Sequence, residues 1–259
     1  ILCSLISSDD GVLDLKKLNL VPNFSQKRFF EGLTNERIDI KEISKYWIGA
    51  QKRIIKNGKY RLLKSHNANC YINNNPFTNA EITAGIIYIV RDPRDVTCSA
   101  SKHFDLSLEE TKNVLLDRSA QTIARKNIDH EITTFLGSWS DNYNSWKSFN
   151  KKVLVMKYED LVLKKKDSIL RIVEFLNLFF PLKIDKQKLE NCLRTTSFKY
   201  LSSMEESGGF GESVSSKDEK KIQFFNKGLV DNWKNILSPK ISNEIEMNFK
   251  NEMTELGYV

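Results

Sequence analysis

The stretch that decides the fold is GIIYIVRDPRDVTCS, residues 85–99. Its first six residues form an unbroken run of mostly β-favouring apolar side chains, which predicts a strand buried on both faces. The polar turn 91–95 breaks this run, and Val96 to Phe104 is predicted to continue as a helix. A buried strand followed within a few residues by a helix is typical of an α/β protein.

The rest of the chain alternates in the same way between short apolar runs and amphipathic segments. Residues 60–63 and 152–156 are predicted to be further strands, and apolar side chains spaced by three and four from Asp39 to Ile54 predict one helix. No internal repeat or linker interrupts the alternation. The sequence therefore indicates one α/β domain over residues 1–259, with a central, mostly parallel sheet flanked by helices.

Helices and one loop are predicted between these strands. Three helices are predicted from start signals: one after the capping box Ser107–Glu110, one after the cap Asp185, and one from Ser238 to Gly257. Three more are predicted from apolar residues: at residues 1–6, along the stripe of Phe135, Trp139, Tyr143 and Trp146, and around Leu170, Val173 and Leu176. The polar stretch from Ser202 to Lys217 has no periodicity and is predicted to be a loop.

The composition excludes several classes of protein. With 11 Gly and 5 Pro in 259 residues, the chain is neither collagen-like nor a Pro/Gly-rich disordered segment. Its apolar runs are only a few residues long, whereas a membrane-spanning helix needs about 20. The 4 cysteines follow no metal-ligand spacing and favour a reducing compartment. A net charge of +7 fits either an ordinary solvated surface or an anionic partner such as a nucleotide.

The turn after residue 90 is the strongest indication of a ligand. Ligands of parallel sheets gather at the carboxyl ends of strands, and the free N–H groups at the start of a helix attract anions. Arg91 at the strand tip and the hydroxyl of Ser99, eight residues later, could together grip one phosphate. The alternative, from the residues alone, is an Arg91–Asp95 ion pair beside an ordinary helical serine.

This segment resembles the sulfotransferases that use 3'-phosphoadenosine 5'-phosphosulfate (PAPS). In that family a strand, an Arg-Asp-Pro-Arg-Asp-type turn and a serine eight residues after the arginine hold the 3'-phosphate of the cofactor. Arg91 and Ser99 match those two positions. The resemblance therefore implies that both residues bind the cofactor.

Residues 62–66, Leu-Leu-Lys-Ser-His, resemble the Lys-x-His that ends a strand in the same family. The resemblance implies that His66 removes the proton of the acceptor hydroxyl, a role that suits an imidazole near neutral pH. It also implies that Lys64 stabilises the charge that develops on the transferred group. The alternative for His66 is a structural role, which is the commoner one for a lone histidine.

Three later segments match the family in the expected order. The residues that the resemblance places beside the adenine are Tyr158, from a Tyr-Glu-x-Leu sequence, and Thr196 and Phe198, from a Thr-Ser-Phe sequence. Those that it places beside the 3'-phosphate are Asn226, Lys227 and Gly228, from a segment that resembles Arg-Lys-Gly-x-x-Gly-Asp-Trp-Lys. Aromatic stacking plus a hydroxyl suits a purine. The alternative is that these aromatic residues simply belong to the core.

The chain departs from the family pattern in two places. Asn226 stands where the family has an arginine, and since an amide carries no charge a weaker grip on the phosphate is expected. The phosphosulfate loop of the family, a Pro-Lys-x-Gly-Thr-x-Trp-type sequence whose N–H groups surround the 5'-phosphosulfate, is not found in residues 1–259. Residues 1–6 resemble the helix that follows this loop, so the numbered chain is expected to begin just past it.

The resemblance implies a P-loop NTPase-like three-layer sandwich and a cytoplasmic enzyme, with an upstream targeting segment left open. The enzyme would move a sulfonate from PAPS to a hydroxyl or amine of a small-molecule acceptor and release adenosine 3',5'-bisphosphate. No metal and no nucleic-acid partner are expected, and no membrane segment is expected in the visible chain. Two other hypotheses stay open. One is a non-catalytic nucleotide-binding relative, suggested by Asn226 and the loop, and the other, less favoured, is a P-loop nucleotide kinase.

Overall fold

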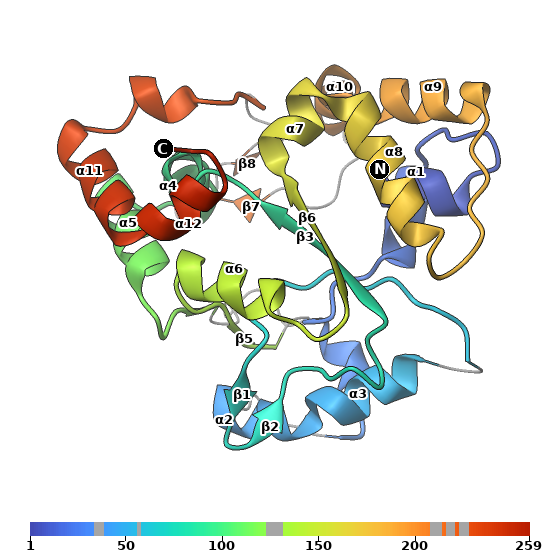
Figure 1. The fold of residues 1–259 in the computed structure, drawn as a ribbon, viewed down its shortest axis with the longest axis horizontal. Coiled ribbons are helices and arrows are strands. Elements are labelled where there is room, and N and C mark those ends of the chain that lie inside the picture. The colour runs from blue at the N-terminus through green and yellow to red at the C-terminus, as the bar shows by residue number, and fades with distance from the viewer. Residues whose placement is uncertain (34–38, 56–57, 123–131, 208–213, 216–220, 223–227) are drawn as a thin grey trace. The chain divides into compact units, whose positions relative to one another are not determined.

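The computed structural model describes two compact units (Figure 1). The described residues are 1–33, 39–55, 58–122, 132–207, 214–215, 221–222 and 228–259. Unit 1 comprises Ile1–Leu20, Ile89–Leu116 and Met156–Val259, and unit 2 comprises Val21–Tyr88 and Asp117–Val155. None of the helices described in these ranges is long and apolar enough to cross a bilayer.

Two six-residue strands, β3 (Gly85–Val90) and β6 (Lys152–Lys157), pair in parallel, and helices flank them (Figure 1). The predicted α/β class is therefore confirmed, as are the strands expected at 85–90 and 152–156. The shorter strands of the described residues form antiparallel pairs: β1 (Tyr71–Ile72) with β2 (Asn75–Pro76), β4 (Gln121–Thr122) with β5 (Thr134–Phe135), and β7 (Val214–Ser215) with β8 (Lys221–Ile222).

Two predictions about strands are wrong. β3 is not buried on both faces: Val90 is 2% exposed but Ile89 is 46% exposed, because within the described residues β3 has β6 as its one neighbour in the sheet. Residues 60–63 form no strand either. The regular pairing there is a single bridge, in which the Lys64 amide donates to Pro22 O (2.9 Å) and the Phe24 amide donates to Lys64 O (2.8 Å).

Most helices begin at a polar capping residue that can be recognised in the sequence. The helices of unit 1 are α1 (Leu2–Ser7), α4 (Pro93–Phe104), α5 (Leu108–Leu116), α7 (Tyr158–Leu163), α8 (Lys165–Leu176), α9 (Lys186–Thr195), α10 (Phe198–Glu206), α11 (Pro239–Asn248) and α12 (Lys250–Glu255), with the 3₁₀ turns η1 (Leu15–Leu20) and η4 (Asn232–Asn235). Ser107 and Glu110 form the predicted capping box before α5, and the carboxylate of Asp185 accepts the Lys188 amide at the start of α9 (2.7 Å).

Unit 2 is built around aromatic side chains. Phe77 packs edge-on against Phe24, Trp47 and Trp146, with ring centroids 5.3–5.9 Å apart, and all four are buried. The helical elements of this unit are η2 (Lys27–Phe29), α2 (Ile40–Ile43), η3 (Ser44–Tyr46), α3 (Trp47–Ile54) and α6 (Trp139–Lys147). The single helix predicted from Asp39 to Ile54 is therefore interrupted by a 3₁₀ turn.

Three further expectations are corrected. Phe135 lies in β5, so the predicted helical stripe begins at Trp139. Residues 202–206 of the predicted loop belong to α10, and Val214–Ser215 form β7. The last helix is divided at Phe249, which has a backbone conformation (φ −112°, ψ 19°) outside the α-helical range.

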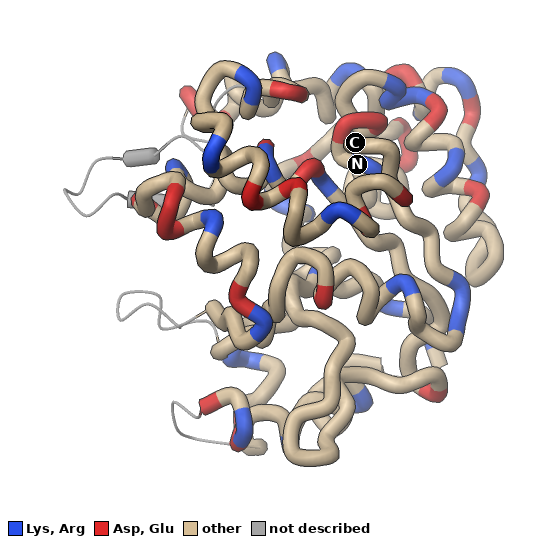
Figure 2. Tube along the Cα trace, turned by 60° about the vertical axis from the view of Figure 1, so that its left-hand side comes forward, with Lys and Arg blue, Asp and Glu red and all other residues tan. Residues whose placement is uncertain are grey.

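Positive and negative side chains are interspersed along the traces of both units (Figure 2). This arrangement corresponds to an ordinary solvated surface, with opposite charges near each other, more closely than to one large basic patch. Neither sign of charge is confined to one part of the described trace.

Gly11 offers a test of packing in unit 1. Its φ is +79°, and a Cβ at this position would lie closer than 3.0 Å to the Lys188 carbonyl of α9. We expect Gly11→Ala to lower the free energy of unfolding by about 2–3 kcal/mol, because both backbone strain and the close approach oppose a side chain. Gly257→Ala is the matched control, since Gly257 also has a positive φ (+67°) but nothing within 4 Å. In urea unfolding, Gly257→Ala should lower the free energy of unfolding by about 1 kcal/mol. An equal decrease for both variants would contradict the packing argument.

Candidate functional site

The turn after β3 is built by the side chain of Asp92. This carboxylate accepts the Arg94 amide at 2.8 Å and so caps α4, with Pro93 as the first helical residue. The helix consequently begins three residues earlier than the predicted Val96. Asp92, Arg94 and Asp95 are each at most 5% exposed, so this turn is a buried polar cluster rather than a solvated loop.

Arg91 connects three of the segments that the sequence singles out. It follows β3 directly and is partly buried. Its guanidinium carbon lies over the Tyr158 ring, 4.4 Å from the ring centroid, and Nη2 donates a hydrogen bond to Leu229 O at 3.2 Å. The predicted 3'-phosphate and adenine segments thus meet at this side chain. Ser99 lies on the second turn of α4 with its side chain exposed.

Asp95 holds the segment that follows Gly228. Its two carboxylate oxygens accept the amides of Asp231 (2.8 Å) and Trp233 (2.9 Å), and Asp231 adopts a left-handed conformation with a φ of +62°. Burial raises the pKa of Asp95, an effect that the hydrogen bond from the Trp233 amide and the charge of Arg91 partly offset. The carboxylate therefore has a structural role in attaching residues 231–233 to α4.

Gly228 lies against the ring of Phe198. A Cβ on Gly228, whose φ is +57°, would overlap the Phe198 ring at less than 3.0 Å. Phe198 is the first residue of α10 and keeps 37% of its surface exposed. Glycine is thus the residue that lets the backbone lie against this ring.

Thr196 has a structural environment. It is buried, and its hydroxyl donates to Cys192 O at 2.6 Å, while its carbonyl accepts a hydrogen bond from the Nζ of Lys165. Burial lowers the pKa of Lys165. Asn226 and Lys227, the other residues predicted beside the 3'-phosphate, lie outside the described residues.

Lys64 and His66 belong to unit 2. Both side chains are exposed, whereas the backbone around them is anchored: the His66 carbonyl accepts from Asn142 Nδ2 (3.3 Å), and Asn142 Oδ1 accepts from the Tyr88 hydroxyl (3.0 Å). The next residue, Asn67, is buried, and its carbonyl accepts the Trp146 indole N–H at 2.8 Å. The backbone of this segment is therefore anchored, whereas the side chains of Lys64 and His66 are accessible.

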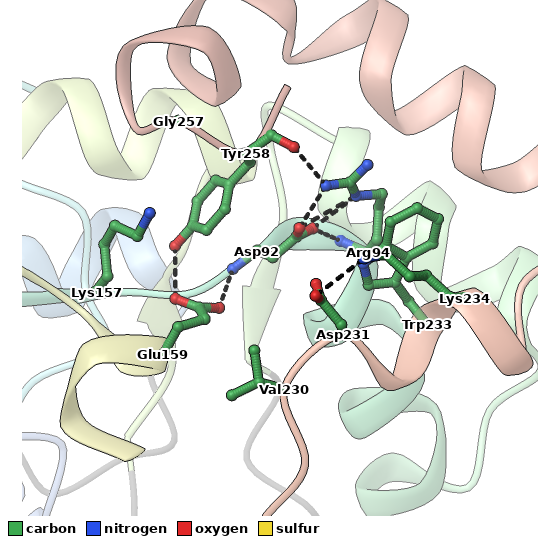
Figure 3. A pocket seen from close by; sticks show the side chains of 10 residues that line it. All are labelled: Asp92, Arg94, Lys157, Glu159, Val230, Asp231, Trp233, Lys234, Gly257 and Tyr258. Atoms are coloured by element: carbon green, nitrogen blue, oxygen red, sulfur yellow. Dashed lines mark hydrogen bonds and ion pairs between the residues drawn. The ribbon is translucent and has the colours of Figure 1, made fainter. Parts of the chain in front are cut away.

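A cavity of about 490 Å³ in unit 1 is lined in part by the chain neighbours of Arg91 and Tyr158 (Figure 3). Its lining residues are Asp92, Arg94, Lys157, Glu159, Val230, Asp231, Trp233, Lys234, Gly257 and Tyr258. Three cations and three carboxylates offset one another in this set. Elsewhere in the described chain, as here, no group of three His, Cys, Asp or Glu side chains is placed to hold a metal ion.

Sequence reasoning missed Arg94, Glu159 and Tyr258. Arg94 lies with its guanidinium 3.9 Å from the Trp233 ring centroid and donates to both Asp92 (2.6 Å) and Glu246 (2.5 Å). The Asp-Pro pair before Arg94 is a helix-start signal that indicates the cap, and Glu159 stands within the quoted Tyr-Glu-x-Leu sequence. Nothing local marks Tyr258, whose partner Glu159 is 99 residues away.

The role of Asp95 can be measured. We expect Asp95→Ala to lower the free energy of unfolding by about 2–3 kcal/mol, because two backbone N–H groups lose the acceptor that they share. Asp10→Ala is the control, since Asp10 is an exposed carboxylate that accepts the Val12 amide at 3.0 Å, and its loss should be below about 1 kcal/mol. Urea unfolding followed by circular dichroism distinguishes the two, and a loss no larger for Asp95→Ala would contradict its structural role.

Comparisons with known proteins place these features in a family. A family model described as the sulfotransferase domain matches residues 17–257. Cytosolic sulfotransferase 3 of Arabidopsis thaliana is 25% identical over 215 residues, which are 80% of this chain and 66% of that protein. Sulfotransferase 1E1 of Bos taurus is 27% identical over 195 residues, 74% of this chain and 62% of that protein. The chain thus spans just under two thirds of the length of these relatives.

Solved structures show the same fold. A mouse sulfotransferase, SULT7A1, crystallised with PAP, superposes with a TM-score of 0.52 at 21% identity over 78% of this chain and 68% of that one. Retinol dehydratase in a complex with retinol and PAP has a TM-score of 0.54 at 17% identity, over 79% of this chain and 56% of that one. With the family model matching nearly its whole length, the chain belongs to the sulfotransferase-domain family.

Proposed function

We propose that the protein containing this chain transfers a sulfonate group from PAPS to a hydroxyl or amine of a small-molecule acceptor. Membership of the sulfotransferase family supports the class of reaction. PAP, which is present in the related structures, is the nucleotide left when PAPS has given up its sulfonate. The curated relatives include proteins named cytosolic sulfotransferases, and we propose the cytoplasm as the location of this one.

The observation that carries the proposal is the position of Arg91. Its guanidinium lies over Tyr158 and donates to the carbonyl of Leu229, one residue after Gly228. An arginine between the strand-end turn, the Tyr-Glu segment and the glycine segment supports the binding of a phosphate there, because a guanidinium forms charge-assisted hydrogen bonds with phosphate oxygens. The glycine at 228 supports the same proposal, since it keeps the backbone beside Phe198 free of a side chain.

The residue types that the resemblance selects in unit 1 suit a nucleotide, since they include cations for phosphate and aromatic rings for the base. We propose that Arg91, Ser99, Asn226, Lys227 and Gly228 hold the 3'-phosphate, and that Tyr158 and Phe198 border the adenine. For Thr196 we propose a border contact through its methyl group, because its hydroxyl and amide donate to Cys192 O and its carbonyl accepts from Lys165. PAPS, when bound, supplies the sulfonate.

His66 and Lys64 are the proposed catalytic residues. An alcohol is a weak nucleophile, so a base that removes its proton as the new O–S bond forms would accelerate transfer. The ammonium group of Lys64, two residues away, would stabilise negative charge that develops on the transferred group and the leaving phosphate. The exposure of both side chains and the anchored backbone beneath them support these roles.

The cofactor assignment is tested by isothermal titration with adenosine 3',5'-bisphosphate and with AMP. We expect the bisphosphate to bind at least tenfold more tightly, because charge-assisted hydrogen bonds to its 3'-phosphate are worth about 1.5–3 kcal/mol. Arg91→Ala should remove most of this preference while leaving AMP binding within about twofold. Equal binding of the two nucleotides by the unaltered protein would contradict the assignment.

The catalytic assignment is tested with His66→Ala. Turnover of labelled PAPS with a pool of phenols, alcohols and amines should fall by about 10²–10⁴, the usual contribution of a general base. The affinity for adenosine 3',5'-bisphosphate should stay within about twofold, because His66 belongs to a different segment from the nucleotide residues. A variant that retains full turnover would rule out His66 as the base, and an unaltered protein that binds nucleotide but transfers nothing would favour a non-catalytic relative.

A further inference from the structure

Tyr258 closes a ring of hydrogen bonds at the ends of the two long strands (Figure 3). Its hydroxyl donates to Glu159 Oε2 at 2.9 Å, and its carbonyl accepts from Arg94 Nη2 at 2.9 Å. Glu159 Oε1 accepts the Asp92 amide at 3.0 Å, and the Asp92 carboxylate binds the Arg94 guanidinium at 2.6 Å. One residue therefore connects to both sides of the turn, through its side chain and through its backbone.

The ring is made from the chain neighbours of the Arg91–Tyr158 pair. Asp92 follows Arg91 and Glu159 follows Tyr158, so the hydrogen bond from the Asp92 amide to Glu159 ties together the two peptides that carry the stacked side chains. A change in the direction of the Glu159 carboxylate would move the Asp92 amide. Because Arg91 shares that peptide group, its guanidinium would move as well.

The Glu159 carboxylate needs hydrogen-bond donors from the protein because the residue is only 8% exposed. A buried carboxylate without its hydrogen bonds is costly, so the loss of one donor would turn it toward another cation or toward water. Lys157 lines the same cavity and lies over the Tyr258 ring, with Nζ 4.7 Å from the centroid. Burial raises the pKa of Tyr258, and the adjacent carboxylate raises it further, so the phenol remains a donor at physiological pH.

We propose that Tyr258 is a positioning residue for the 3'-phosphate site: it holds Glu159 and Arg94, and through Asp92 it sets the direction of Arg91. This inference rests on the proposed function, because it assigns Tyr258 a part in recognition of the extra phosphate. It does not place Tyr258 in contact with nucleotide.

The test compares the affinities for adenosine 3',5'-bisphosphate and AMP, by isothermal titration, in Tyr258→Phe. This variant removes one hydroxyl and keeps the ring. The bisphosphate should bind about fivefold more weakly, whereas AMP should change by less than about twofold. Gly11→Ala is the control for destabilisation alone, since it should lower stability in the same unit without changing the ratio of the two affinities.

A double-mutant cycle separates positioning from a general loss of structure. If Tyr258 acts through Arg91, adding Tyr258→Phe to Arg91→Ala should cost less than about twofold in bisphosphate affinity. A further fivefold loss in that background, or an unchanged ratio in Tyr258→Phe, would overturn the inference and leave the proposed function standing. An unaltered protein without preference for the bisphosphate would overturn both.

Glu159→Gln provides a second break in the same ring. The amide keeps the size of the side chain but weakens its hydrogen bonds to Asp92 and Tyr258, since neither would then be charge-assisted. A loss of bisphosphate preference in the same direction, about two- to threefold, is expected even if Tyr258→Phe does not fold. Full retention of the preference in this variant would contradict the role of the ring.

Discussion

The hydrogen bond between the Asp92 amide and the buried Glu159 carboxylate joins the ends of the two paired strands, and the candidate nucleotide site depends on it. Parallel strands bring their carboxyl ends to one edge, but edge proximity alone does not orient side chains. Here one carboxylate fixes the peptides that follow β3 and β6. Arg91 and Tyr158, the residues that precede Asp92 and Glu159, lie with the guanidinium over the ring.

The two carboxylates of the turn, Asp92 and Asp95, bind different parts of the protein. Asp92 caps α4 and binds Arg94, whereas Asp95, one turn further, accepts two amides of the segment 231–233. Both carboxylates bind donors of the protein itself. Buried carboxylates of this kind are stabilised by the backbone and guanidinium donors around them, and they leave Arg91 as the cation directed toward the glycine segment.

The catalytic candidates of unit 2, Lys64 and His66, also follow backbone that hydrogen bonds hold in place. Side chains on irregular backbone lose precision unless that backbone is held, and here Asn142, together with the buried Asn67, holds it. The amide and carbonyl of Lys64 are paired with Pro22 and Phe24, and the carbonyl of His66 accepts a hydrogen bond from Asn142.

Local signals in the sequence determined the strands at 85–90 and 152–156 and the capped helices, because caps, periodicity and turn residues act over about four residues. The burial of β3, the division of the helix from Asp39 to Ile54 and the ring through Tyr258 were decided by the tertiary structure. Tyr258 and Glu159 are 99 residues apart, and Asp95 and Asp231 are 136 apart. Pairings over such separations depend on how whole elements pack, a property that no local stretch of sequence contains.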